Sequence, residues 1–105
     1  MTQYAACRNL NAATKARVPL LLDLQSSLLA DLESRVVAPM CLASAFKDKA
    51  LRRLMPTVEV EGKSYVCLVP QMASIPRLLV GPAVADLAAH RGEFVAALDF
   101  LLTGV

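Results

Sequence analysis

His90 is the only histidine in this chain of 105 residues, and few other side chains could carry acid–base or covalent chemistry. Its place beside Arg91 is more typical of an exposed helix residue than of a general base. Asp23 and Asp86 have no second carboxylate nearby in the sequence, so we expect them to accept backbone hydrogen bonds at turns. No serine or cysteine stands in a known nucleophile motif, and zinc-protease and phosphate-loop patterns are missing. These residues predict a protein that binds and does not catalyse.

One enzymatic alternative stays open. Lys47, Lys49, Arg52 and Arg53 form the densest basic stretch, with Asp48 inside it, and scattered Arg, Thr and Asp side chains could build a metal-free RNA-cleaving site. No aromatic residue is interleaved to stack on bases, however, and a net charge of +2 is too small to indicate nucleic-acid binding. A solvated charged surface is the favoured interpretation of this stretch.

The cysteines indicate a reducing compartment, and we expect a cytoplasmic protein. Cys7, Cys41 and Cys67 are odd in number, far apart and outside any CxxC pair, so neither a zinc site nor a redox motif is predicted. Free cysteines commonly behave as small buried hydrophobes, which is the favoured interpretation. The longest apolar stretch, residues 18–30, is interrupted by polar residues and is not expected to span a bilayer. We expect no metal, no cofactor and no membrane segment.

The elements that position these residues are predicted to be short strands. Strand-length apolar runs cover residues 3–8, 18–24, 36–42, 57–60, 63–69, 72–74 and 78–80. Glu61-Gly62 lies between two of them and predicts a two-residue hairpin turn, and Gly81-Pro82 predicts another turn. Pro19 and Pro39 each remove a backbone donor, which favours a strand start, an edge or a bulge.

The C-terminal segment has the pattern of an amphipathic helix. Its stripe at i, i+1, i+4, i+7 and i+8 consists of Phe94, Val95, Leu98, Leu101 and Leu102. Thr103-Gly104 predicts the end of the helix, because glycine tolerates the left-handed conformation. Residues 26–33 are ambiguous, and residues 43–53 could hold a short helical turn.

The length of the chain predicts one domain over residues 1–105. Hydrophobic residues make up 56% of the chain, while aromatic residues make up 5% and tryptophan is missing. We therefore expect an aliphatic core, with apolar surface left over for a subunit interface.

A series of short motifs, in order, resembles a known family. The motifs are Asp23-Leu24-Gln25-Ser26, Arg35-Val36-Val37-Ala38-Pro39, Asp48-Lys49, Leu54-Met55-Pro56-Thr57-Val58, Gly62, Gln71-Met72-Ala73-Ser74-Ile75-Pro76, Val80-Gly81, Val84-Ala85-Asp86-Leu87 and Gly104-Val105. They follow one register after the first loop, and together they resemble the CcdB family of bacterial toxins from toxin–antitoxin systems. The stretch from Met72 to Pro76 is close to the family's Met-Ala-Ser-Val-Pro motif, and we expect it to be a buried strand and turn.

The resemblance implies a fold and a function. The fold is an antiparallel, SH3-like barrel or sheet of the CcdB/MazF kind with a C-terminal helix, in a homodimer. The implied function is binding to the A subunit of DNA gyrase, which traps the enzyme on cleaved DNA without catalysis. A cognate antitoxin would neutralise the toxin through a disordered tail, and the complex would repress its own operon, with the antitoxin alone reading the operator DNA.

The family's gyrase-binding residues match this chain only in part. The family's helix ends in Phe-Trp-Gly-Ile, and Thr103 here replaces the tryptophan, whose indole could stack on an arginine for about 0.5–2 kcal/mol. The family's Ile-Ile pair matches Leu28-Leu29, which core or dimer contacts explain equally well, and its helical asparagine matches Asp99. The implied gyrase-binding set is Leu28, Leu29, Asp99, Leu102, Thr103, Gly104 and Val105.

Three hypotheses follow, in falling order of preference. The first is a CcdB-type toxin that targets gyrase. The second keeps the fold and the antitoxin but is weak or inactive on gyrase, because of Thr103. The third is a MazF-like ribonuclease, supported only by the basic stretch.

Overall fold

The computed structural model describes residues 3–29, 31–46 and 54–104. The strands in these ranges are β1 (Ala5–Asn9), β2 (Leu20–Asp23), β3 (Ser34–Leu42), β4 (Thr57–Val60), β5 (Lys63–Cys67), β6 (Ala73–Pro76) and β7 (Val80–Asp86). Helix α1 covers Arg91–Thr103, and short 3-10 turns are η1 (Ser27–Leu29), η2 (Ala43–Ala45), η3 (Val69–Gln71), η4 (Arg77–Leu79) and η5 (Ala88–His90). The prediction of a mainly β fold with a C-terminal helix is confirmed.

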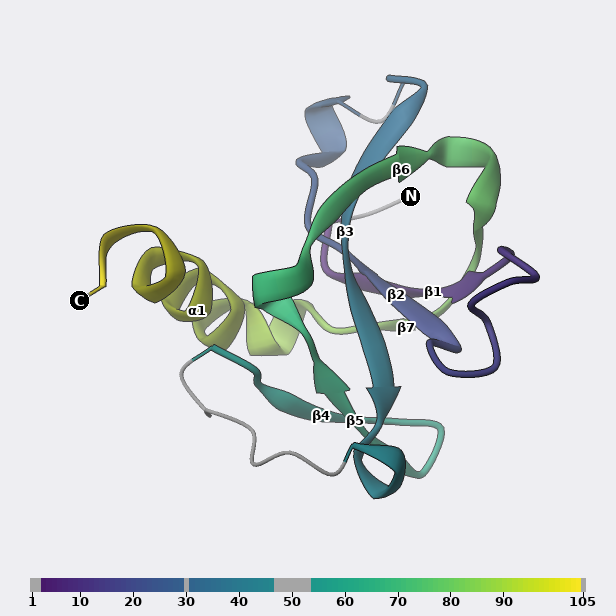
Figure 1. Cartoon of the computed structure of the whole chain (residues 1–105). Coiled ribbons are helices and arrows are strands. Elements are labelled where there is room, and N and C mark those ends of the chain that lie inside the picture. The colour runs from purple at the N-terminus through teal and green to yellow at the C-terminus, as the bar shows by residue number, and fades with distance from the viewer. Residues whose placement is uncertain (1–2, 30, 47–53, 105) are drawn as a thin grey trace.

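The strands form one curled antiparallel sheet. Their order is β4-β5-β3-β2-β1-β7, and β6 pairs with β3 beside this row. Strand β3 is long enough for two partners, because residues 34–37 pair with β6 and residues 40–42 pair with β5. Figure 1 shows β6 arching away from the row and returning through β7 to β1, so that the sheet closes on itself as a partial barrel.

Pro39 lies inside the sheet, which corrects the expectation of an edge. It faces Leu21 of β2, and its carbonyl accepts the Leu68 N–H at 2.8 Å on the other side. The N–H and C=O of one strand residue point to the same side, so the missing donor faces the place where β3 changes partner from β6 to β5. The proline therefore interrupts no ladder. Pro19 precedes β2 directly, as expected of a strand start.

The hairpin prediction is confirmed, and the second turn prediction is wrong. Glu61 and Gly62 have φ values of 52° and 79°, the left-handed pair that a type I′ turn requires. Gly81-Pro82 instead lies within β7. A Cβ on Gly81 would approach the Arg8 carbonyl oxygen to 2.9 Å. Glycine is thus needed there for the close approach of β7 to β1, and not for a change of direction.

The stretch from Met72 to Pro76 forms a strand but is not buried, contrary to expectation. Within β6 the side chains of Ala73, Ser74 and Pro76 are exposed and Ile75 is half-buried. The strand following it in the prediction, residues 78–80, is mostly the 3-10 turn η4.

Two main clusters of apolar side chains hold the sheet and helix together. The first packs α1 against the sheet through Phe94, whose ring stacks on Tyr4 with centroids 5.5 Å apart. The second fills the inside of the curl with Ala5, Cys7, Leu21, Val37 and Val80. In the described part of the chain, no helix has the length and apolar character needed to cross a membrane.

Candidate docking surface

The predicted binding residues lie on two separate projections of the molecule. Leu28 and Leu29 belong to η1, and Asp99 through Gly104 form the end of α1. Val105 lies outside the described residues. Figure 1 shows η1 and the C-terminal end of α1 well apart from each other. The structure of one chain therefore does not bring the two groups together.

The end of α1 projects beyond the core. Phe94 and Ala97 are buried against the sheet, whereas Leu102 is 73% exposed. Gly104 has a φ of 74° and donates its N–H to the Phe100 carbonyl at 2.8 Å, so the predicted helix end is confirmed. An apolar side chain this exposed, at the last turn of a helix, is available for a contact with another molecule.

Thr103 is turned back on its own helix. Its Oγ1 donates a 2.6 Å hydrogen bond to the carbonyl of Asp99, one turn earlier. The hydroxyl is thus occupied by a local bond, and the side chain has no ring to present. Asp99 is exposed, so its carboxylate adds negative charge to this surface.

Turn η1 carries the most exposed leucine of the described residues. Leu28 is 94% exposed and Leu29 is 50% exposed, and no residue of η1 is buried. The interpretation of Leu28 as a core residue is therefore wrong for the single chain. Its side chain is accessible to another molecule.

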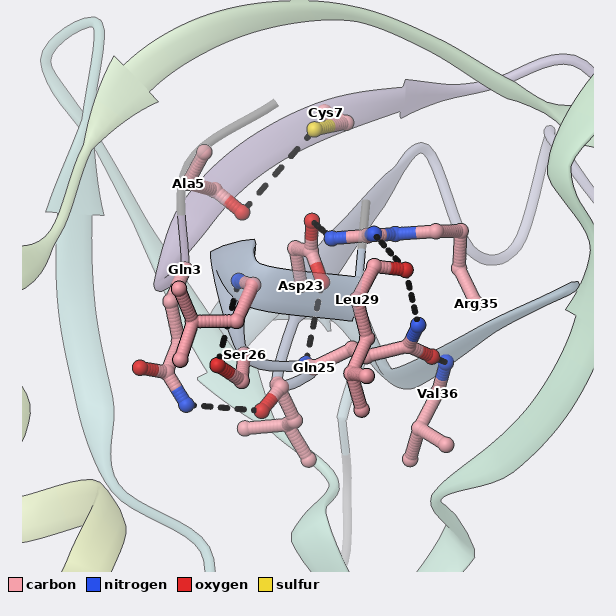
Figure 2. A network of polar contacts seen from close by, with 11 residues as sticks. Gln3, Ala5, Cys7, Asp23, Gln25, Ser26, Leu29, Arg35 and Val36 are labelled. Atoms are coloured by element: carbon pink, nitrogen blue, oxygen red, sulfur yellow. Dashed lines mark hydrogen bonds and ion pairs between the residues drawn. The ribbon is translucent and has the colours of Figure 1, made fainter. Parts of the chain in front are cut away.

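Sequence reasoning missed a buried polar network beneath η1. Asp23 of β2 and Arg35 of β3 form an ion pair in which both side chains are fully buried. Figure 2 shows this pair beside Gln25, whose backbone N–H donates to Asp23 Oδ1 at 3.0 Å. The expectation that Asp23 accepts a backbone hydrogen bond is confirmed, but its arginine partner was not predicted.

One signal for this pair is present in the sequence. Arg35 and Val37 are two residues apart, so both project from the same side of β3, the side that fills the curl. Asp23 lies opposite Val37 in the pairing register of β2 and β3. A charged residue two positions from a buried valine indicates a partner, but the register that supplies Asp23 appears only in the fold.

Other polar groups have structural or surface roles. His90 Nδ1 lies 2.9 Å from Glu93 Oε1 at the start of α1, on a largely exposed surface. Asp86 accepts the Ala88 N–H at 3.0 Å, as predicted for a turn. Among the described residues no group of three or more His, Cys, Asp or Glu side chains is placed to hold a metal ion. The basic stretch of residues 47–53 lies outside the described part.

The cysteines are buried, as the sequence indicates. Burial raises the pKa of Cys67 to about 12, with the carboxylate of Glu93 adding to the effect. Burial also raises the pKa of Cys7 and of Cys41. All three thiols are therefore protonated at neutral pH, and a protonated thiol is a poor nucleophile.

A hollow of about 270 Å³ is lined by residues that include Leu21, Val37 and Pro39. Its lining is mostly apolar and also includes the polar residues Asn9, Asn11 and Arg17. Asn9 itself is occupied, since its Nδ2 donates to Val18 O at 2.8 Å and to Thr14 Oγ1 at 3.0 Å.

Comparisons with known proteins agree with the fold and the motif series. The family model described as "CcdB protein" matches residues 3–104. A solved structure described as "Crystal structure of Mtb toxin" has 15% sequence identity and a TM-score of 0.66, over 95% of this chain and 99% of that chain. At this identity the likeness shows a shared fold. The match to the family model, which spans almost the whole sequence, shows that the chain belongs to the CcdB family of toxins.

Proposed function

We propose that this chain is the toxin of a toxin–antitoxin pair and that it binds the A subunit of DNA gyrase, trapping the enzyme on cleaved DNA. The observation that carries the proposal is the exposure of Leu28 and Leu102 in a member of the CcdB family. Accessible apolar side chains on both projections can contact a partner, and membership of the CcdB family supports assigning them that role. The binding surface consists of Leu28, Leu29, Asp99 and residues 102–105.

The toxin acts without catalysis and as a homodimer in the cytoplasm. The large exposed apolar side chains, which also include Leu10 and Leu32, support the existence of a subunit interface. A second copy would also bring further copies of both projections to one target. Size-exclusion chromatography with light scattering tests this part, and a mass of one chain at micromolar concentration would contradict it.

The cognate antitoxin neutralises this toxin through a disordered tail and alone contacts the operator DNA. In this proposal the isolated chain has no affinity for duplex DNA, in keeping with its net charge of +2. A gel shift with the operator should need the antitoxin, and binding by the toxin alone would contradict this part.

The central experiment measures binding of the purified chain to the gyrase A subunit, together with growth on expression in a gyrase-dependent bacterium. We expect binding, growth arrest and accumulation of cleaved DNA. A variant that lacks residues 103–105 should lose all three. If the full chain neither binds the gyrase A subunit nor arrests growth, the proposal is overturned. Sequence-specific cleavage of added RNA would instead support the ribonuclease alternative.

One observation favours a second candidate, a CcdB-type toxin with weak activity on gyrase. Thr103 stands where the family has tryptophan, and its hydroxyl is bonded to the Asp99 carbonyl. It cannot supply a stacking contact of about 0.5–2 kcal/mol. Under this candidate Thr103→Trp gains affinity for the gyrase A subunit by roughly tenfold, whereas tight binding by the natural chain would rule it out.

A further inference from the structure

We infer that Gln25 and Arg35 are positioning residues that hold turn η1, and with it Leu28, in one orientation. As a statement about gyrase binding, this inference rests on the function proposed above. As a statement about the turn, it stands on the hydrogen bonds and burial of the described residues alone.

Turn η1 has no apolar anchor of its own. None of its residues is buried, and Leu28 contributes nothing to the clusters that fill the fold. Leu32, on the following segment, is also half exposed. Since packing does not fix a turn of this kind, its position has to come from polar contacts.

The carbonyl oxygen of Leu29 supplies that contact. It accepts a hydrogen bond from Gln25 Nε2 at 2.9 Å, and Arg35 Nη1 lies 3.5 Å from the same oxygen. Figure 2 shows the Arg35 and Gln25 nitrogens approaching this oxygen from opposite sides. The same oxygen accepts the Leu32 N–H at 3.2 Å, so the two side chains hold the point where η1 ends.

The two anchoring side chains are themselves held by the sheet. Gln25 Oε1 accepts the Val36 N–H of β3 at 3.0 Å. Arg35 is paired with the buried carboxylate of Asp23 in β2, and that carboxylate also accepts the Gln25 N–H. A continuous set of polar contacts thus runs from two central strands to the base of an exposed leucine.

The energetics favour an orienting role over a stabilising one. A buried ion pair is weak evidence for stability, because desolvation of the charges offsets their attraction. Arg35 Nε is also buried and has no hydrogen-bond partner among the described residues. An apolar pair of similar volume would hold the strands together equally well, but it could not donate to the Leu29 carbonyl.

The test is Gln25→Glu, which keeps the acceptor for Val36 N–H and replaces the donor to Leu29 with an oxygen. Gln3→Glu is the matched control, because Gln3 Nε2 donates to the Leu24 carbonyl at 3.1 Å outside the turn. Amide hydrogen exchange of Leu28, Leu29 and Leu32 should be about fivefold faster in Gln25→Glu, the effect of one lost hydrogen bond. The control should leave these amides unchanged. Unchanged exchange in Gln25→Glu would overturn the inference, whatever the chain binds.

Affinity for the gyrase A subunit then tests the link to function. Gln25→Glu should weaken binding about fivefold in the natural chain, and should have no further effect in a Leu28→Ala background. Equal losses in both backgrounds would mean that Gln25 does not act through Leu28. If the natural chain does not bind gyrase A while the exchange result holds, the proposed function fails and the positioning of the turn stands.

Discussion

Leu28 and Leu102 are exposed for different local reasons. Leu28 is exposed on a turn that polar side chains hold by hydrogen bonds. Leu102 is exposed because the last turn of α1 extends beyond the earlier turns, which pack on the sheet. In both cases the sequence keeps an apolar side chain in water at a site that folding does not require. Such side chains can be removed with little effect on the fold, which separates binding from stability.

We predict that Leu28→Asp weakens binding to the gyrase A subunit by about thirtyfold or more and leaves stability nearly unchanged. A charge in the centre of an apolar contact should cost about 2 kcal/mol or more of binding free energy. The free energy of unfolding should change by no more than about 0.5 kcal/mol, as at other exposed positions. Calorimetric titration and urea unfolding measure the two quantities.

Leu78→Asp is the matched control, because Leu78 is 88% exposed and lies on another 3-10 turn, η4. It should leave gyrase binding unchanged. If Leu28→Asp binds as tightly as the natural chain, Leu28 is not part of the binding surface.

At Asp23, by contrast, we predict a large loss of stability. Asp23→Ala leaves the Arg35 guanidinium buried without its partner, and breaking a buried pair in this way costs about 3–5 kcal/mol. Asp86→Ala is the control, since Asp86 also accepts a 3.0 Å hydrogen bond from the N–H two residues ahead but is exposed. Asp86→Ala should lower the free energy of unfolding by about 1 kcal/mol. Equal losses in urea unfolding would show that the ion pair is not what Asp23 contributes.

At the scale of elements, the sequence predicts best those structures that depend on local spacing. The 3.6-residue stripe around Phe94 and the stop at Gly104 define α1, and Glu61-Gly62 defines the hairpin, because each signal lies within a few residues. The gyrase-binding candidates at the end of α1 come from the resemblance to the family, and only their position at a helix end follows from local spacing.

Features that depend on pairing between distant segments were not predictable in this way. Pro39 is typical of an edge, but β3 changes partner at that residue and so accommodates it inside the sheet. Gly81-Pro82 is typical of a turn, yet the glycine meets the Arg8 carbonyl of a strand far away in sequence. The ion pair of Asp23 and Arg35 likewise needs the register of β2 on β3.

We predict opposite effects on stability for alanine substitutions at two glycines, Gly81 in β7 and Gly92 in α1. Gly81→Ala should destabilise the pairing of β1 and β7 by about 1–3 kcal/mol, because the new Cβ would lie 2.9 Å from a backbone oxygen that cannot move aside. Gly92→Ala should stabilise the chain by about 0.5–1 kcal/mol, because a Cβ there meets nothing within 4 Å inside α1. Thermal unfolding of both variants measures the two shifts. A stabilising Gly81→Ala would contradict the close approach of the two strands.

At the scale of the whole molecule, each of the three cysteines lies in a different apolar cluster. Cys67 lies in the cluster that packs α1 on the sheet, and Cys7 lies in the cluster inside the curl. Cys41 belongs to a third, smaller cluster with Val66 and Leu68. Because burial raises the pKa of each thiol, the protonation of these groups is coupled to folding of the entire chain.

We predict that the free energy of unfolding falls as pH rises above about 9. The pKa of Cys67 is about 12 in the folded chain against a usual value of 9.0, so between these values the unfolded chain has released a proton that the folded chain retains. The stabilisation is complete below pH 9 and is lost toward pH 12, at about 1.4 kcal/mol per pH unit for this thiol. Urea unfolding at a series of alkaline pH values measures the slope.

Cys67→Ala provides the comparison, because other groups also titrate in this range. The variant lowers stability at every pH through its cavity, but its slope between pH 9 and 12 should be shallower than that of the natural chain. Only the difference in slope between the natural chain and the variant measures the contribution of the Cys67 thiol. Identical slopes would mean that the Cys67 thiol ionises as readily in the folded chain as in the unfolded one, and therefore that the cluster beneath α1 admits water.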